Sequence, residues 1–317
     1  MSGMKITVAF ITGREAPQLD WLIAGLEQQA KRRDEIELIV VDAYCRPASG
    51  IGLRPIPAIT KVIETRPKPS VWQGPHRLTA HDFFANANAR NTAIALCGTD
   101  YICFVDDRCR VDDGWLAQIR RAARKQEAVV CGPYDKHEDW GLSVDHRRQE
   151  APKGKKRCTG GWCYGGNLAL PLEWALDVNG FEEGCDPVGL EDCVFGHMLE
   201  NAGRRIDFVV GMSIQQDRKG GFVHPLGFPR QDKGQSPNDK SHAIRARFFG
   251  RNRTEFTPDL RALRAQLGQG LSFPVPPHDM IDWYDGTSIR GARLTTEERI
   301  ARARGKGEAI ISGTNRP

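Results

Sequence analysis

Residues 89–107 read ARNTAIALCGTDYICFVDD, and this stretch decides the fold. Its first half consists of small residues that, with those just before it, predict a helix over residues 83–97. Its second half is an apolar strand at residues 101–105 that ends in Asp106 and Asp107. A helix that leads into a buried strand is the repeating unit of an α/β protein. We therefore expect a mostly parallel sheet with flanking helices.

The same alternation extends toward the N-terminus. Residues 5–11 (KITVAFI) and 36–41 (IELIVV) are apolar, β-branched runs that predict two further buried strands. Residues 17–33, between them, carry leucine and isoleucine with the period of a helix. Short strands are also predicted at residues 61–65, 129–132 and 206–213. Parallel strands joined in this way need right-handed crossover connections.

Three segments in the second half carry other signals. Residues 141–166 are rich in glycine, lysine and arginine, and we expect a mobile loop there. Residues 190–201 have apolar side chains at helical spacing. Residues 242–266 predict a basic helical stretch.

Polar residues follow three of the predicted strands. Thr12, Gly13 and Arg14 follow the first strand, Asp42 the second, and the Asp106-Asp107 pair the strand at 101–105. Ligands of such sheets bind beyond the carboxyl ends of the strands. Each of these residues could serve only as a turn residue, but the three together favour one shared ligand site.

Two adjacent carboxylates at a strand end favour a bound cation. Anions within ~4–6 Å of each other disfavour joint ionisation unless a cation offsets them. Mg²⁺ and Mn²⁺ are typically held by one or two carboxylates together with substrate phosphates. Taken alone, the Asp-Asp pair could equally cap a helix.

Three segments together carry a family resemblance. Residues 89–107, residues 165–183 (GGNLALPLEWALDVNGFEE) and residues 189–208 (GLEDCVFGHMLENAGRRIDF) come in a fixed order along the chain. They resemble the Asp-x-Asp strand, the acceptor-side segment and the Glu-Asp helix of family 2-like glycosyltransferases with the GT-A (Rossmann-like) fold. The last segment also resembles a galactosyltransferase-like C-terminal subdomain. The resemblance covers about residues 5–225.

This resemblance implies a domain organisation. Residues 1–225 would form the GT-A glycosyltransferase domain, with a nucleotide-sugar half at 1–135 and an acceptor and catalytic half at 136–225. Residues 226–317 would form a basic C-terminal extension.

The resemblance also implies roles for single residues and a cofactor. The implied donor is a nucleotide sugar, UDP-linked, and the implied cofactor is Mn²⁺ or Mg²⁺. The implied donor-binding residues are Thr12, Arg14, Asp42, Arg90, Asp106 and Asn167. The implied metal ligands are Asp106, Asp107 and His224.

One position departs from the family pattern. The third residue of the Asp-x-Asp motif is Arg108 rather than aspartate or histidine. Asp107 could take the metal in its place, or Arg108 could itself neutralise a diphosphate, which would weaken metal dependence. His224, in turn, could be an ordinary surface or packing residue.

Glu191 and Asp192 open the predicted helix at 190–201. Sugar transfer to a hydroxyl needs a base that takes the proton, and a helix N-terminus helps to keep a carboxylate ionised. By resemblance Asp192 is this base, in an inverting reaction, and Glu191 orients the acceptor or the sugar. The alternative is that both residues only cap the helix, as acidic residues often do.

The charge distribution suggests an acceptor. Residues 218–317 hold 18 lysines and arginines against 10 acidic residues, although the whole chain carries only +5. Within the basic stretch, aromatic residues alternate with Arg245, Arg247, Arg251 and Arg253. Arginines contact phosphates and aromatic side chains stack on bases. This pattern predicts DNA with hydroxymethylated pyrimidines as the acceptor, as in bacteriophage enzymes that modify their own genome.

Other interpretations of the basic stretch stay open. Its phenylalanines could belong to the protein core, and the arginines could simply solvate the surface. The acceptor would then be a saccharide or a protein side chain. A non-catalytic nucleic-acid-binding protein on a transferase scaffold is a further alternative, but the retained carboxylate pairs argue against it.

The composition indicates a folded protein without a membrane span. Apolar residues make up 40% and charged residues 27% of the chain, which excludes a mainly disordered protein. No apolar stretch approaches the ~20 residues that cross a bilayer, and the N-terminus lacks the features of a signal peptide. Nine cysteines, an odd number, favour reduced thiols and a cytoplasmic location, which for a phage protein is the host cytoplasm. Their spacing does not fit a zinc site.

Overall fold

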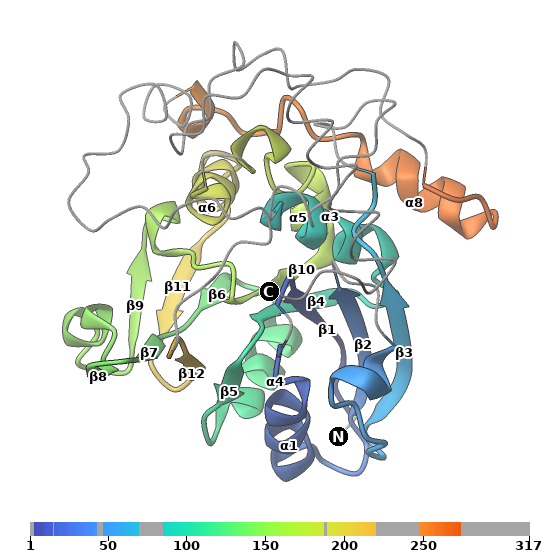
Figure 1. Cartoon of the computed structure of the whole chain (residues 1–317). Coiled ribbons are helices and arrows are strands. Elements are labelled where there is room, and N and C mark those ends of the chain that lie inside the picture. Colours follow the sequence, from blue (N-terminus) through green and yellow to red (C-terminus); the bar gives the residue numbers. More distant parts are fainter. Residues whose placement is uncertain are drawn as a thin grey trace.

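The computed structural model describes residues 3–14, 16–42, 47–69, 85–186, 189–219 and 247–273. A large mixed sheet lies between two layers of helices, and a smaller sheet lies beside it (Figure 1). The expected α/β architecture with flanking helices is therefore confirmed. Among the described residues, no helix combines the length and the apolar character needed to span a bilayer.

The large sheet has a parallel half and a mixed half. In spatial order its strands are β3 (Ile59–Thr65), β2 (Glu35–Asp42), β1 (Lys5–Thr12), β4 (Tyr101–Asp106), β10 (Asn167–Pro171), β6 (Val129–Cys131), β11 (Ile206–Val209) and β9 (Lys155–Cys158). The first four run parallel to one another. β10 runs antiparallel to both β4 and β6, and β9 runs antiparallel to β11.

The helices divide between the two faces of this sheet. α3 (Asn86–Leu96), α5 (Leu172–Asp177), α6 (Glu191–Asn201) and α8 (Leu260–Gly268) share one apolar core with it. α1 (Leu19–Gln29) and α4 (Trp115–Lys125) contribute to the core on the other face. Short 3₁₀ turns lie at Ala48–Ile51, His146–Glu150, Gly160–Trp162 and Glu183–Cys185. α1 buries its leucines and isoleucine at the helical spacing that predicted it.

The predicted convergence of strand ends is confirmed for the three strands concerned. Thr12 at the end of β1 pairs with Asp42 at the end of β2, and Ile11 pairs with Asp106 at the end of β4. The polar residues that follow these strands therefore share one edge of the sheet.

The smaller sheet closes over this edge. Its strands, in order, are β5 (Cys109–Val111), β12 (Ile214–Asp217), β7 (Tyr134–Glu138) and β8 (Gly141–Ser143). The sequence did not predict it, because its strands are short and half polar and gain their partners only through tertiary contacts.

The expectation of a mobile loop at residues 141–166 is wrong. This segment contains β8, β9 and two 3₁₀ turns. Buried Arg147 organises it by pairing with Asp145 and by donating to the carbonyl oxygens of Trp162 and Gly132. Arg147, whose charge suggested exposure to solvent, is thus buried and holds the segment together.

Of the basic stretch predicted as helical at residues 242–266, the described residues are helical at 247–249 and in α8, whereas 250–259 are not. Asp259 caps α8 by accepting the N–H of Ala262. Phe248 and Leu260 are fully buried in the core shared by α3, α5 and α6. This part of the chain therefore packs as an integral layer of the fold.

Candidate functional site

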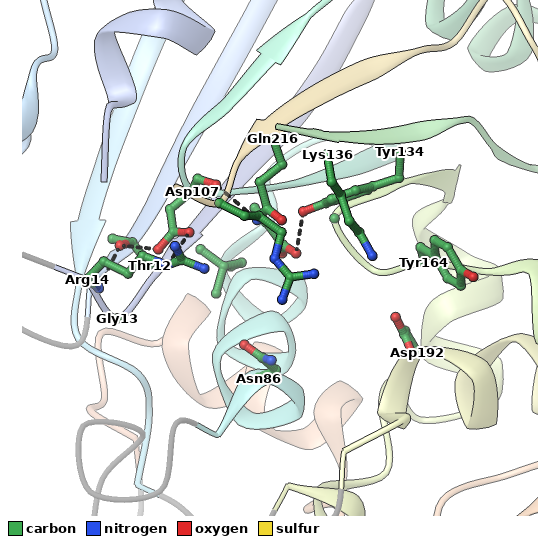
Figure 2. A pocket seen from close by; sticks show the side chains of 14 residues that line it. Thr12, Gly13, Arg14, Asn86, Asp107, Tyr134, Lys136, Tyr164, Asp192 and Gln216 are labelled. Carbon is green, nitrogen blue, oxygen red and sulfur yellow. Dashed lines mark hydrogen bonds and ion pairs between the residues drawn. The ribbon is translucent and has the colours of Figure 1, made fainter. Parts of the chain in front are cut away.

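A cavity of about 310 Å³ opens where the strand ends of the large sheet face the smaller sheet (Figure 2). The large sheet contributes Thr12, Arg14, Asp106 and Asp107, whereas β7 and β12 contribute Tyr134, Lys136 and Gln216. Asn86 of α3, Tyr164, Asp192 of α6 and Arg218 complete the polar lining. Four predicted donor or metal residues and the predicted base thus face one cavity.

One end of the cavity is built on Asp107. Its carboxylate accepts a hydrogen bond from Thr12 Oγ1 at 2.9 Å and pairs with Arg14 Nε at 3.1 Å. Burial raises the pKa of Asp107 to about 6, although Arg14 and Thr12 favour the charged form. Asp107 is therefore engaged by protein groups and fixes the positions of Thr12 and Arg14.

Arg90 connects the end of β4 to the start of α6. Its guanidinium donates to Asp106 Oδ1 at 2.9 Å and to Glu191 Oε1 at 2.6 Å, and its side chain is only 2% exposed. Burial alone would lower the pKa of Arg90, but the charges of Asp106, Glu191 and Asp192 outweigh it and hold the pKa above its ordinary value. Arg90, a predicted donor contact, instead lies behind the cavity and ties β4 to α6.

Gly165 makes this arrangement possible. A Cβ atom at position 165 would overlap the guanidinium of Arg90. The backbone N–H of Gly165 also donates to Asp192 Oδ2 at 3.0 Å. One glycine therefore leaves room for the buried arginine and orients the carboxylate above it.

The two acidic residues of α6 play different parts. Asp192 faces the cavity and accepts N–H bonds from Gly165 and Cys193. Glu191 is buried against Arg90, and burial, followed by the charge of Asp192, raises its pKa. Asp192 is thus the carboxylate available to a substrate, and Glu191 holds Arg90.

Besides Arg90, two further predicted donor residues do not line the cavity. Asn167 is fully buried, donating to the carbonyl oxygens of Pro133 and Met212 and accepting from Trp115 Nε1. Asp42 is buried at the end of β2 and is not among the lining residues. The hydrogen bonds of Asn167 therefore connect the large sheet to the smaller sheet.

The sequence missed Tyr134, Lys136 and Tyr164. Tyr134 donates its hydroxyl to Asp106 Oδ2 at 3.2 Å, and Tyr164 packs 3.7 Å from the guanidinium of Arg147. Tyr134 and Lys136 are two apart on β7 and share a face, so a prediction of that strand would have found them together.

Few of the described residues are available for the predicted metal site. Asp106 is 27% exposed and lines the cavity, so it fits a divalent ion that is held mainly by substrate phosphates. Within the described ranges, no three carboxylate, histidine or cysteine side chains gather closely enough to hold a metal ion by themselves. His224 lies outside the described residues.

The basic stretch is partly neutralised by its own acids. Arg247 and Arg251 pair with Glu255, and Arg253 pairs with Asp259. Phe248 is buried in the core, so for this residue the alternative of a core phenylalanine is confirmed. Arg245 lies outside the described residues. The three described arginines remain partly exposed at the surface.

Comparison with known proteins identifies part of the chain. Residues 82–174 match the profile of the family described as Glycosyl transferase family 2. This part of the chain is similar to a family 2 glycosyltransferase domain. The match contains Arg90, Asp106, Asp107 and Lys136 and ends before Asp192. The mixed α/β sheet with flanking helices is consistent with the GT-A fold of the family 2 domain.

Individual relatives are more distant. The "Probable N-acetylgalactosaminyltransferase 9" of Caenorhabditis elegans is 26% identical over 172 residues, which cover 47% of this chain and 29% of that protein. The structure of GalNAc-T7 with UDP, GalNAc and Mn²⁺ aligns at 12% identity with a TM-score of 0.47, covering 87% of this chain and 59% of that one. S. aureus TarS aligns at 16% identity with a TM-score of 0.44, covering 68% and 37%. The chain therefore spans less than two thirds of each of these proteins.

Proposed function

We propose that this protein is a glycosyltransferase that moves a sugar from a nucleotide-linked donor to an acceptor hydroxyl. The observation that carries the proposal is the single cavity in which Asp106 and Asp107 of the family 2 domain face Asp192 of α6. The buried Arg90 connects the two sides, because it pairs with Asp106 and with Glu191, the neighbour of Asp192. A site that serves only to bind has no need of a carboxylate poised opposite the donor residues.

The donor occupies the cavity in a defined direction. Its nucleoside lies toward Thr12 and Arg14, which Asp107 fixes in place. Its diphosphate lies near Asp106, where a divalent ion, Mn²⁺ or Mg²⁺, would be held by Asp106 and the phosphate oxygens. When bound, such an ion supplies positive charge for the departing diphosphate. A UDP-linked donor, with UDP-GalNAc as the first candidate, accords with the name of the worm relative.

Asp192 then acts as the general base. It accepts the proton of the acceptor hydroxyl while the hydroxyl oxygen bonds to the anomeric carbon of the sugar. The bond from that carbon to the diphosphate oxygen breaks, and its electron pair leaves with the nucleoside diphosphate. A single displacement of this kind inverts the anomeric configuration. General-base assistance typically contributes ~10²–10⁴-fold.

For the acceptor we retain DNA with hydroxymethylated pyrimidines as the first candidate. Its support is the excess of 18 basic over 10 acidic residues in 218–317. The ion pairs of Arg247, Arg251 and Arg253 are exposed, and exposed pairs are worth only ~0–1 kcal/mol, so phosphates could replace their carboxylates. A saccharide or protein hydroxyl is the alternative, favoured by the burial of Phe248. A bacteriophage origin and a cytoplasmic location stay predictions.

A mass-spectrometric transfer assay tests the proposal. The protein is incubated with a panel of nucleotide sugars and with hydroxymethylated DNA, unmodified DNA or oligosaccharides, with Mn²⁺ or with chelator. We expect a mass increase of one sugar on one acceptor class, and its loss in Asp192→Asn. Asp113→Asn, which replaces an exposed aspartate outside the cavity, is the matched control. Equal turnover by wild type and Asp192→Asn would refute the assignment of the base.

The same samples separate the acceptor candidates. If only oligosaccharides gain mass, the DNA acceptor is wrong and the transferase proposal stands. If no donor is consumed with any acceptor while DNA is bound, the non-catalytic nucleic-acid-binding alternative is favoured.

A further inference from the structure

Lys136 and Arg218 bring two positive charges to the same cavity. β7 and β12 run parallel, and Gln216 pairs with Lys136 in their register. The N–H of Arg218 donates to the carbonyl oxygen of His137 at 2.8 Å, which fixes the chain just beyond the end of β12. Both side chains line the cavity, and Figure 2 shows the Lys136 side chain extending into it from β7.

Most other charges in the cavity are already paired. Arg14 pairs with Asp107, and Asp106 pairs with Arg90. By contrast, none of the carboxylates in the described ranges lies within 4.0 Å of Lys136 Nζ. Arg218 has a loose pair with Glu138 at 3.5 Å. The cavity wall formed by β7 and the end of β12 therefore carries two cations that lack a close carboxylate partner among the lining residues.

The two cations also repel each other. Burial, followed by the charge of Arg218, lowers the pKa of Lys136. Like charges side by side in a half-buried site are unfavourable unless an anion offsets both. Such an arrangement is typical of a site whose ligand brings the missing negative charge.

We propose that Lys136 and Arg218 form an anion subsite that holds the diphosphate of the donor. This inference rests on the proposed function and adds residues to it outside the Asp-x-Asp motif. The position supports a diphosphate, because both residues line the same cavity as Asp106 and Asp192. A diphosphate also provides two anionic groups for the two cations.

The subsite would act most strongly as the reaction proceeds. When the bond between the anomeric carbon and the diphosphate oxygen breaks, the leaving group gains one negative charge. Cations fixed at that place interact more strongly with the transition state than with the bound donor. Lys136 and Arg218 would therefore lower the barrier as well as hold the donor.

Nucleotide binding tests the subsite without turnover. Dissociation constants of UDP, UMP and uridine are measured by calorimetry for wild type, Lys136→Met and Arg218→Gln, with Mn²⁺ and with chelator. We expect wild type to prefer UDP over UMP, each variant to lose about tenfold or more in UDP affinity, and uridine to bind all three alike. Lys136→Arg should retain the preference, and Lys153→Met, an exposed lysine outside this cavity, should match wild type.

The outcomes separate this inference from the proposed function. If wild type binds none of the three nucleotides, the nucleotide-sugar proposal itself fails. If wild type prefers UDP and both variants keep the same UDP-to-UMP ratio, the subsite is refuted and the transferase proposal stands. If a variant loses uridine affinity as well, or melts well below wild type, its effect is structural, and the other variant decides.

Discussion

Replacing Arg90 by methionine should destabilise the whole protein, because its guanidinium is the shared ion-pair partner of two carboxylates. Methionine replaces the aliphatic part of the arginine side chain but not the guanidinium, whose Cζ lies 5.4 Å from the centre of the Phe181 ring. What is lost is the charge between Asp106 and Glu191. Asp106 is 27% exposed and can be rehydrated, whereas the side chain of Glu191 is 7% exposed and cannot. Most of the destabilisation should therefore come from Glu191.

The expected size follows from what an unpaired buried charge costs. Removing one partner of a buried ion pair typically destabilises a protein by about 3–5 kcal/mol. Because Glu191 can take up a proton to escape part of this cost, we expect a value near the lower end, about 3 kcal/mol at pH 7. Adding Glu191→Gln to Arg90→Met should restore about 1–3 kcal/mol, since the double variant leaves no charge at position 191.

Urea unfolding of the wild type, the two single variants and the double variant measures this coupling. Intrinsic fluorescence and circular dichroism should give the same midpoints, so that one free energy describes each protein. The reasoning is refuted if Arg90→Met unfolds within about 0.5 kcal/mol of wild type, or if the two substitutions are simply additive.

Three further predictions concern a second buried carboxyl group, the metal site and Gly165. Burial raises the pKa of Glu182 from 4.5 to about 7, so the folded protein keeps a proton that the unfolded chain loses, and stability should fall by roughly 3 kcal/mol as pH rises from 4.5 to 7. Urea titrations at pH 5 and pH 7.5 should show a smaller fall in Glu182→Gln, and parallel pH dependences would contradict this account. Asp106→Asn should abolish the enhancement of UDP binding by Mn²⁺, which calorimetry can measure against Asp113→Asn, and an unchanged enhancement would remove Asp106 from the metal site. Gly165→Ala should lower the melting temperature and, if the proposed function holds, turnover as well, because its methyl group displaces Arg90, whereas Gly154→Ala, at an open glycine with a positive φ, should lower only the melting temperature.

The core of the fold could be predicted because its signals are local. The strands β1, β2 and β4 are continuous apolar runs that end in polar residues, and their parallel pairing follows from the helices between them. The edge where these strands end was therefore predictable without any tertiary information. Thr12, Arg14, Asp106 and Asp107 were found for this reason.

The other wall of the cavity could not be predicted in the same way. β7 reads YDKHE and β12 reads IQQD, and neither carries an apolar pattern that marks a strand. They become strands because they pair with each other and enclose polar side chains such as Gln216. The prediction of a mobile loop at residues 141–166 failed for a related reason. A charged residue such as Arg147 in a glycine-rich segment suggests exposure to solvent, and its buried ion pair with Asp145 can be seen only in the structure.

The arginine bridge also has a consequence for how this site can change during evolution. A substitution that neutralises position 106 or 191 would leave Arg90 with one of its two carboxylate partners, and loss of Arg90 would leave both acids without this partner. Gly165 should covary with Arg90, because a Cβ atom at position 165 would overlap the guanidinium. Positions 90, 106, 165 and 191 should therefore covary among homologues. Homologues that lack the arginine should carry a neutral residue at position 191 and should no longer require glycine at position 165. Such covariation would link the family 2 domain to α6, which lies outside the matched region.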